Sequence, residues 1–132
     1  MIDIIMLGTT AQFPTKYRNH SSFFLRFKTF KALFDCGEGT QRQMRIAKLS
    51  PHNIDSIFIS HWHGDHTLGL GGVIQSMNAT QRTNPLTIYG PDGTKQRVKN
   101  ILGTYYFKKN FLIKPNLPPE PEAENIDAGL RP

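Results

Sequence analysis

Four side chains of the kinds that bind metal ions lie within residues 61–66, which read HWHGDH. Imidazole nitrogen and carboxylate oxygen together suit zinc or a similar first-row transition metal. A single histidine on an apolar face is more often a core residue than a ligand, but core packing gives no reason for four such side chains after one apolar stretch. The motif therefore indicates a metal centre.

The spacing within this motif divides the four side chains into two pairs. In an extended segment, residues two apart project to the same side, so His61 and His63 are expected to bind one ion. Asp65 and His66 follow the turn at Gly64 and are expected to bind a second ion. Two ions roughly 3.5–4 Å apart suit the hydrolysis of a phosphate ester, because one stabilises the attacking oxygen and the other the leaving oxygen. Asp65 is a candidate both for a ligand and for the group that accepts a proton from the attacking water.

Apolar periodicity predicts the elements that position this motif. Strands are expected over residues 2–7, 21–27, 31–34, 55–60 and 86–89, and helices over 40–49, 70–77 and 98–106. This order indicates an α/β layered fold, with one domain over residues 1–112. Beyond it, residues 113–132 alternate prolines with acids and are expected to form an extended or disordered tail.

The formal charge of +6 is distributed unevenly along the 132 residues. Residues 1–119 hold 15 Lys and Arg against six Asp and Glu, a net charge of +9, whereas residues 120–132 carry −3. A basic body favours a polyanionic partner, nucleic acid before an anionic membrane surface, although a solvated basic surface gives the same composition. No apolar run approaches the roughly 18 residues of a membrane span, and no signal peptide is indicated. The single cysteine, Cys36, suits a reducing compartment, so a cytoplasmic location is expected.

The motif HWHGDH resembles the signature of the metallo-β-lactamase superfamily, and its neighbours resemble one family within it. The matching segments are Gly8-Thr9, residues 13–19 (FPTKYRN), residues 34–41 (FDCGEGTQ), residues 60–70 (SHWHGDHTLGL) and residues 88–91 (IYGP). Their order and spacing are similar to those of ribonuclease Z, the tRNA 3′-processing endonuclease. The resemblance runs from Met1 to about Gly103 and implies the N-terminal half of an αββα sandwich, a mixed sheet with helices packed on one face.

The resemblance also implies how the site works. It assigns His61 and His63 to one zinc ion, Asp65 and His66 to the other, and the proton acceptor to Asp65. Asp35 resembles a family position beside the metals, and we interpret it as a carboxylate that orients a metal-bound histidine rather than as a ligand. His20, His52 and Cys36 match no part of the site and are interpreted as ordinary residues of the fold.

Precursor tRNA is the substrate that the resemblance implies, and a homodimer is the implied assembly. Residues 14–19 resemble the loop that faces the tRNA acceptor end. Lys16 and Arg18 are suited to phosphate, and Tyr17 can stack on a base. An ordinary solvated turn is the alternative interpretation of this loop.

The sequence also departs from the family. The family adds a later His, an Asp that bridges the two metals and a final His, yet no His follows His66, and neither Asp92 nor Asp127 lies in a bridging motif. Each metal keeps two ligands, one fewer than catalytic zinc usually has. The first hypothesis is therefore the N-terminal portion of a zinc endoribonuclease that is inactive alone. The alternatives are a non-catalytic truncated paralogue that binds tRNA or pairs with a full-length subunit, and another hydrolase of the superfamily.

Overall fold

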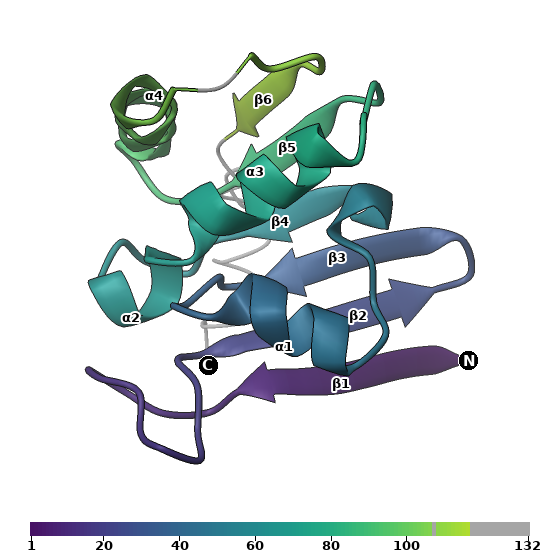
Figure 1. The fold of residues 1–132 in the computed structure, drawn as a ribbon, viewed down its shortest axis with the longest axis vertical. Coiled ribbons are helices and arrows are strands. Elements are labelled where there is room, and N and C mark those ends of the chain that lie inside the picture. Colours follow the sequence, from purple (N-terminus) through teal and green to yellow (C-terminus); the bar gives the residue numbers. More distant parts are fainter. Residues whose placement is uncertain (107, 117–132) are drawn as a thin grey trace, which may run out of the picture.

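Six strands form one mixed sheet in the order β1-β2-β3-β4-β5-β6, in a computed structural model that describes residues 1–106 and 108–116 (Figure 1). The strands are β1 (Ile2–Gly8), β2 (Ser22–Phe27), β3 (Phe30–Phe34), β4 (Ser56–Phe58), β5 (Leu86–Tyr89) and β6 (Ile113–Asn116). The helices are α1 (Thr40–Ile46), the 3₁₀ turn η1 (Pro51–Asn53), α2 (Gly64–Thr67), α3 (Leu70–Ala79) and α4 (Thr94–Thr104). Strands β1 to β3 pair antiparallel, and β3 to β6 pair parallel.

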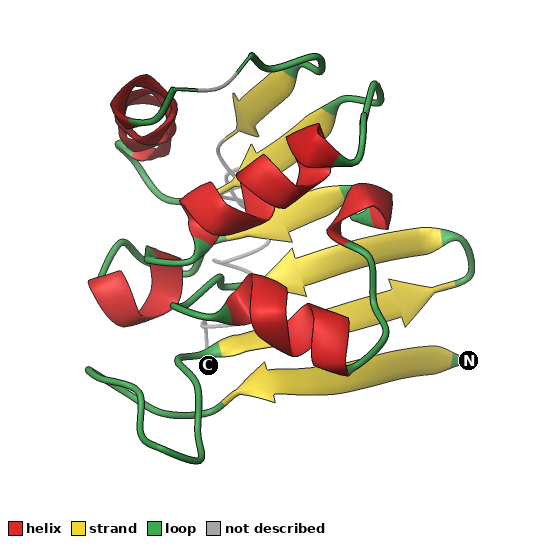
Figure 2. Ribbon diagram, in the orientation of Figure 1, coloured by secondary structure: helices red, strands yellow, loops and turns green. Residues whose placement is uncertain are grey.

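The core lies between the sheet and the helices that cover one of its faces (Figure 2). The apolar stripe expected over residues 70–77 is fully buried on α3, at Leu70, Val73, Ile74 and Met77. Buried strand residues such as Leu33, Ile57 and Ile88 are paired across the sheet and face this stripe from the other side. The alternation of side chains along each strand thus delivers one apolar face to the helices.

The opposite face of the sheet is also apolar. Four aromatic rings stack across it at centroid separations of 4.7, 4.8 and 4.8 Å, in the order Phe23, Phe34, Phe58 and Tyr89. On β1, Ile2, Ile4 and Met6 are each more than half exposed. A sheet that is apolar on both faces is expected in one half of a sandwich, where a second sheet covers the second face.

Several boundaries differ from the sequence prediction. The expected tail begins too early, because Ile113–Asn116 pair with β5 as strand β6 and Ile113 is buried. Pro115 made a strand unexpected here, because proline cannot donate a backbone hydrogen bond. It is tolerated because β6 is the edge strand of the described sheet. Helix α1 ends at Ile46, and the stripe at 98–106 ends with α4 at Thr104, leaving Tyr105 and Tyr106 exposed. Residues 117–132 of the expected tail lie outside the described part of the chain.

None of the helices in residues 1–106 and 108–116 is both long and apolar enough to cross a membrane.

Candidate metal centre

The HWHGDH motif occupies the turn from β4 into α2, at the carboxyl edge of the parallel strands. His61 and His63 belong to the segment after β4, and Asp65 and His66 lie on α2. Asp35 follows β3, the parallel neighbour of β4, and its N–H donates a hydrogen bond to the Phe58 carbonyl at 2.7 Å. Because neighbouring parallel strands end at the same edge of a sheet, Asp35 is brought beside a motif that begins 26 residues later in the chain.

The four motif side chains converge as two close pairs. His61 Nε2 lies 3.1 Å from His63 Nδ1, and His66 Nε2 lies 3.4 Å from Asp65 Oδ2. Two ligand atoms at zinc distances of about 2.0–2.1 Å lie roughly 3.3 Å apart at the corners of a tetrahedron. The ring centroids of His61 and His66 are only 4.2 Å apart, so the two pairs are adjacent. The donor set therefore fits two neighbouring zinc ions, with two ligands for each.

Further ligands are needed to complete either coordination sphere. Over the described ranges 1–106 and 108–116, no three His, Cys, Asp or Glu side chains are arranged to hold one ion together. The assignment of His61, His63, Asp65 and His66 as ligands remains a prediction.

Asp35 holds His66 in one orientation. The Asp35 carboxylate can only accept, so the His66 Nδ1–H donates to Asp35 Oδ2 at 2.7 Å, and Nε2 is left as the ligand atom. The Ser60 N–H and hydroxyl donate to Asp35 Oδ1 at 2.8 and 2.9 Å and fix the carboxylate in turn. This geometry is what the predicted role of Asp35 requires, although the role itself stays a prediction.

A second chain of hydrogen bonds holds Asp65, and the sequence interpretation missed it. His20 is buried; its Nδ1 accepts the Glu38 N–H at 3.2 Å, so its Nε2–H donates to the Gln12 carbonyl at 3.1 Å. The Gln12 N–H then donates to Asp65 Oδ2 at 3.1 Å. This hydrogen bond is the main cause that lowers the pKa of Asp65, so the carboxylate stays ionised and available to a cation.

The glycines that pack against His20 were the one sequence signal that could have pointed to its role. A Cβ on Gly37 would overlap both the His20 side chain and the Asp65 carbonyl, so the GEGT turn must approach this histidine without a side chain. His20 was interpreted as an ordinary residue because a contact spanning 53 residues, from Gln12 to Asp65, depends on a loop path that periodicity does not encode.

His20→Ala is expected to lower the free energy of unfolding by about 2–4 kcal/mol, because the Gln12 carbonyl and the Glu38 N–H lose their partner. The matched control is His52→Ala, since His52 is only partly buried and makes one side-chain hydrogen bond, with Thr80. Urea unfolding of the two variants measures the difference. Equal losses in both would show that His20 does not hold the loop to the metal centre.

The predicted substrate loop is exposed at the same edge of the sheet (Figure 1). Tyr17 is 86% exposed, and Lys16 Nζ lies 5.5 Å from the centre of its ring. The loop is closed by hydrogen bonds from the Thr15 N–H to the Arg18 carbonyl and from the Arg18 N–H to the Thr15 hydroxyl. The role of Lys16, Tyr17 and Arg18 in binding substrate remains a prediction.

Cys36 lies beside the site but is not suited to attack a substrate. It is completely buried, and burial raises the pKa of its thiol to about 12. The thiolate is the nucleophilic form, so Cys36 is inert at neutral pH.

Comparison with known proteins shows the family to which the chain belongs. Residues 2–110 match the family model described as anti-Pycsar protein Apyc1. The chain belongs to this family. It is also 54% identical over 110 residues to the ribonuclease Z of Methanococcus aeolicus, a match that covers 83% of this chain and 34% of the relative. The chain thus spans about a third of the length of the curated relatives that it matches.

Two solved structures have a similar fold. The short form of human tRNase Z superposes with a TM-score of 0.77 at 33% identity, covering 91% of this chain and 47% of that one. The metallo-β-lactamase fold protein YhfI from Bacillus subtilis gives a TM-score of 0.72 at 19% identity, with the same shares covered, and shows the likeness of fold alone. These findings confirm the resemblance to the N-terminal part of ribonuclease Z and the expected half of an αββα sandwich.

Proposed function

We propose that this chain supplies one half of a two-zinc centre that hydrolyses a phosphodiester of precursor tRNA and removes the 3′ trailer. The observation that carries the proposal is the convergence of the two ligand pairs, at 3.1 and 3.4 Å, on one sheet edge. The ribonuclease Z relatives and the tRNase Z fold support tRNA as the substrate class. The proposed enzyme acts in the cytoplasm as a homodimer, as the sequence resemblance implies.

Each residue of the site has a defined task in this proposal. His61 and His63 hold one zinc ion, and Asp65 and His66 hold the other. Bound zinc supplies a water of lowered pKa and stabilises charge on the oxygens of the phosphodiester. Asp35 keeps the proton of His66 on Nδ1, and Asp65 accepts the proton of the attacking water.

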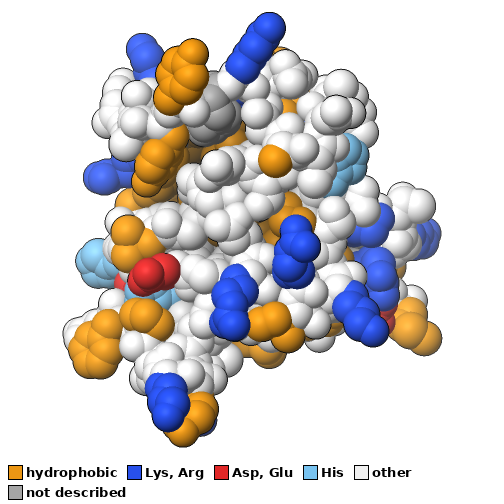
Figure 3. All heavy atoms as spheres, viewed as in Figure 1, with side chains coloured by type: hydrophobic (Ala, Val, Ile, Leu, Met, Phe, Trp, Pro, Cys, Tyr) orange, Lys and Arg blue, Asp and Glu red, His pale blue; other side chains and the backbone are white. Residues whose placement is uncertain are grey.

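The basic side chains of the molecule suit such a substrate. Figure 3 shows Lys and Arg gathered over the face that carries α1, and again at the tip of the loop between β1 and β2. Lys16 and Arg18 of that loop are proposed to contact phosphates near the acceptor end, with Tyr17 stacked on a base. A polyanion as large as tRNA spans both regions.

The 132-residue chain alone, with zinc, is expected to leave 3′-extended precursor tRNA uncleaved, because each metal has only two ligands and no bridging carboxylate. Mixing it with the remaining two thirds of the Methanococcus aeolicus ribonuclease Z is expected to produce cleavage at the trailer junction. The product is followed on a gel with end-labelled RNA. His63→Ala is expected to abolish this cleavage, and Lys28→Ala, on the distant β2–β3 turn, to preserve it.

Two results would contradict the proposal. Robust cleavage by the pure chain would show that two ligands per metal suffice. Cleavage in the mixture that persists in His63→Ala would show that the motif is not the metal centre.

One observation favours the non-catalytic alternative, a chain that binds tRNA without cleaving it. In the part of the chain that the structure describes, no three ligand side chains hold one ion together. This alternative predicts that precursor tRNA binds to the chain and remains intact in the mixture as well.

A further inference from the structure

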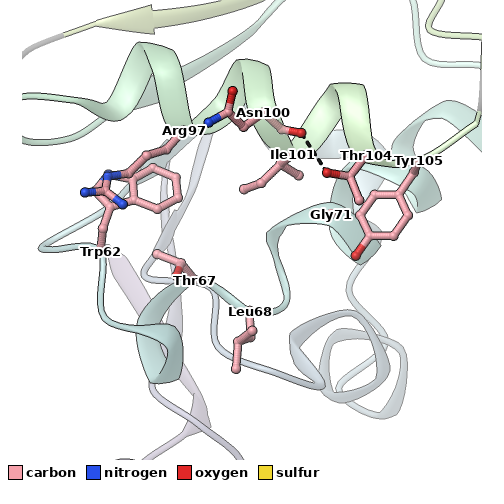
Figure 4. Close-up of a pocket in the computed structure, with 9 residues that line it drawn as sticks. All are labelled: Trp62, Thr67, Leu68, Gly71, Arg97, Asn100, Ile101, Thr104 and Tyr105. Atoms are coloured by element: carbon pink, nitrogen blue, oxygen red, sulfur yellow. Dashed lines mark hydrogen bonds between the residues drawn. The ribbon is translucent and has the colours of Figure 1, made fainter.

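A pocket lies between α4 and the turn that carries α2, and Trp62 of the HWHGDH motif lines it (Figure 4). Its volume is about 320 Å³, within the range of roughly 300–1,000 Å³ typical of small-molecule sites. The lining residues are Trp62, Thr67, Leu68, Gly71, Arg97, Asn100, Ile101, Thr104 and Tyr105. Neither the metal ligands nor the predicted substrate loop contributes to it.

Trp62 connects this pocket to the metal centre. It stands between His61 and His63, and neighbouring side chains of an extended segment project to opposite sides, so its indole points away from the two imidazoles. The indole N–H donates to the Thr94 hydroxyl at 2.9 Å, which fixes the ring against α4. The Arg97 guanidinium lies over the same ring, 5.9 Å from its centre. A ligand in the pocket therefore contacts Trp62, whose two neighbours in the chain, His61 and His63, are predicted metal ligands.

The far end of the pocket carries a second aromatic ring. Tyr105 is 59% exposed and packs over Gly71, where an added Cβ would lie 3.0 Å from its Cε2 atom. Leu68, 63% exposed, and Ile101 form an apolar wall between the two aromatic residues (Figure 4). Exposed aromatic and aliphatic side chains around a cavity of this size suit a flat heterocycle.

The positive charge of α4 favours an anionic ligand. The helix carries Lys95, Arg97 and Lys99 and no acid. Within the described residues, no Asp or Glu lies in ion-pair distance of Arg97. A guanidinium on an aromatic wall, without a carboxylate partner, is well suited to bind phosphate.

We propose that this pocket binds one nucleotide of single-stranded RNA, with its base against Tyr105, Leu68 and Ile101 and its phosphate on Arg97. The proposal rests on the proposed function in one respect: the RNA chain runs from the scissile bond at the metal centre into the pocket. Base stacking on protein aromatic side chains accepts every base, so the site reads the presence of a single strand rather than its sequence.

The test uses the intrinsic fluorescence of Trp62, the only tryptophan in the chain, and needs neither metal nor cleavage. Titration with hexauridylate is expected to change this fluorescence saturably, because a phosphate bound to Arg97 shifts the guanidinium that lies over the Trp62 ring. Tyr105→Ala is expected to weaken binding by about 5- to 100-fold, and Tyr105→Phe to restore it. Arg97→Ala is expected to weaken binding by about 10-fold, measured by the anisotropy of labelled hexauridylate.

The matched control is Lys99→Ala, which removes the same charge from the other side of α4, where Lys99 lies beside Ile113 and Pro115. It is expected to weaken binding by less than about twofold. Equal losses in Arg97→Ala and Lys99→Ala would overturn the proposal, because general charge attraction would explain them. Equal affinity for uridine monophosphate and hexauridylate would overturn the assignment to an RNA chain.

A variant of the metal centre separates this proposal from the proposed function. His61→Ala is expected to keep the Trp62 response to hexauridylate, because the pocket does not use its imidazole. If cleavage by the mixed halves fails while the Tyr105 and Arg97 effects hold, the endonuclease assignment is wrong and the pocket stands. If cleavage holds while hexauridylate leaves Trp62 unchanged, the pocket assignment is wrong.

Discussion

Replacing His61 by alanine is expected to lower the zinc affinity of the chain by at least about 100-fold, more than the loss of a residue that only orients a ligand. His61 contacts members of both ligand pairs: its Nε2 lies 3.1 Å from Nδ1 of His63, its own partner, and its ring centroid lies 4.2 Å from that of His66 in the other pair. Its removal leaves His63 as the only one of the two predicted ligands of that zinc ion. Asp35→Asn is expected to cost about 10- to 100-fold, because His66 keeps its ligand atom but loses its orientation. Competition with a chromogenic chelator measures both affinities.

The control for these variants is His52→Ala, because His52 is a partly buried histidine that contacts Thr80 and none of the motif. It is expected to leave zinc binding unchanged. His63→Ala, Asp65→Ala and His66→Ala are expected to behave like His61→Ala. Full zinc content in all four alanine variants, measured by elemental analysis, would show that the metal lies elsewhere.

The closeness of His61 to His63 and of Asp65 to His66 was predictable because it depends on local geometry. Residues two apart on an extended segment share a side, which placed His61 with His63, and the turn at Gly64 separated them from Asp65 and His66. The position of Asp35 beside His66 follows from the parallel pairing of β3 with β4. Apolar periodicity alone indicated both strands, but only the family resemblance singled out Asp35 among the acids.

Residues that act through the path of a loop were not predictable in this way. Gln12 reaches Asp65 from a left-handed backbone conformation, φ 60°, in a segment without apolar period. The pocket at Trp62 depends on where α4 packs, and the sequence predicts that the helix continues to residue 106. The structure instead leaves Tyr105 exposed beyond the end of the helix. Periodicity identifies which residues are apolar, but it does not say where a helix stops.

The role of Arg82 was likewise not predictable from the sequence, where it is one of 16 basic residues and nothing marks it as buried. It is 3% exposed, and its guanidinium lies 5.6 Å from the centre of the Phe111 ring. All three of its nitrogens donate to backbone carbonyls at 2.6–2.8 Å, those of His52, Ile54, Asn84 and Pro85. Arg82 thereby joins η1 and the start of β4 to the start of β5, the strands on which the metal motif and the pocket are built.

Arg82→Met is therefore expected to lower the free energy of unfolding by about 3–5 kcal/mol, because it retains the apolar stem and leaves several carbonyls unpaired. The matched control is Arg26→Met, whose ion pair with Asp3 is 2.7 Å long but about 40% exposed and is expected to contribute less than about 1 kcal/mol. Urea unfolding followed by Trp62 fluorescence measures both variants.

Arg82→Lys distinguishes the hydrogen bonds from the charge. An ammonium keeps the charge but cannot reproduce the planar fork of donors, so this variant is expected to lose most of the stability that Arg82→Met loses. Recovery of full stability by lysine would show that charge alone holds the two strand starts together. Equal losses in Arg82→Met and Arg26→Met would show that the four carbonyl contacts add nothing beyond a surface ion pair. If the carbonyl contacts dominate, high salt will diminish the effect of Arg26→Met and leave that of Arg82→Met, because only the exposed pair is screened by ions.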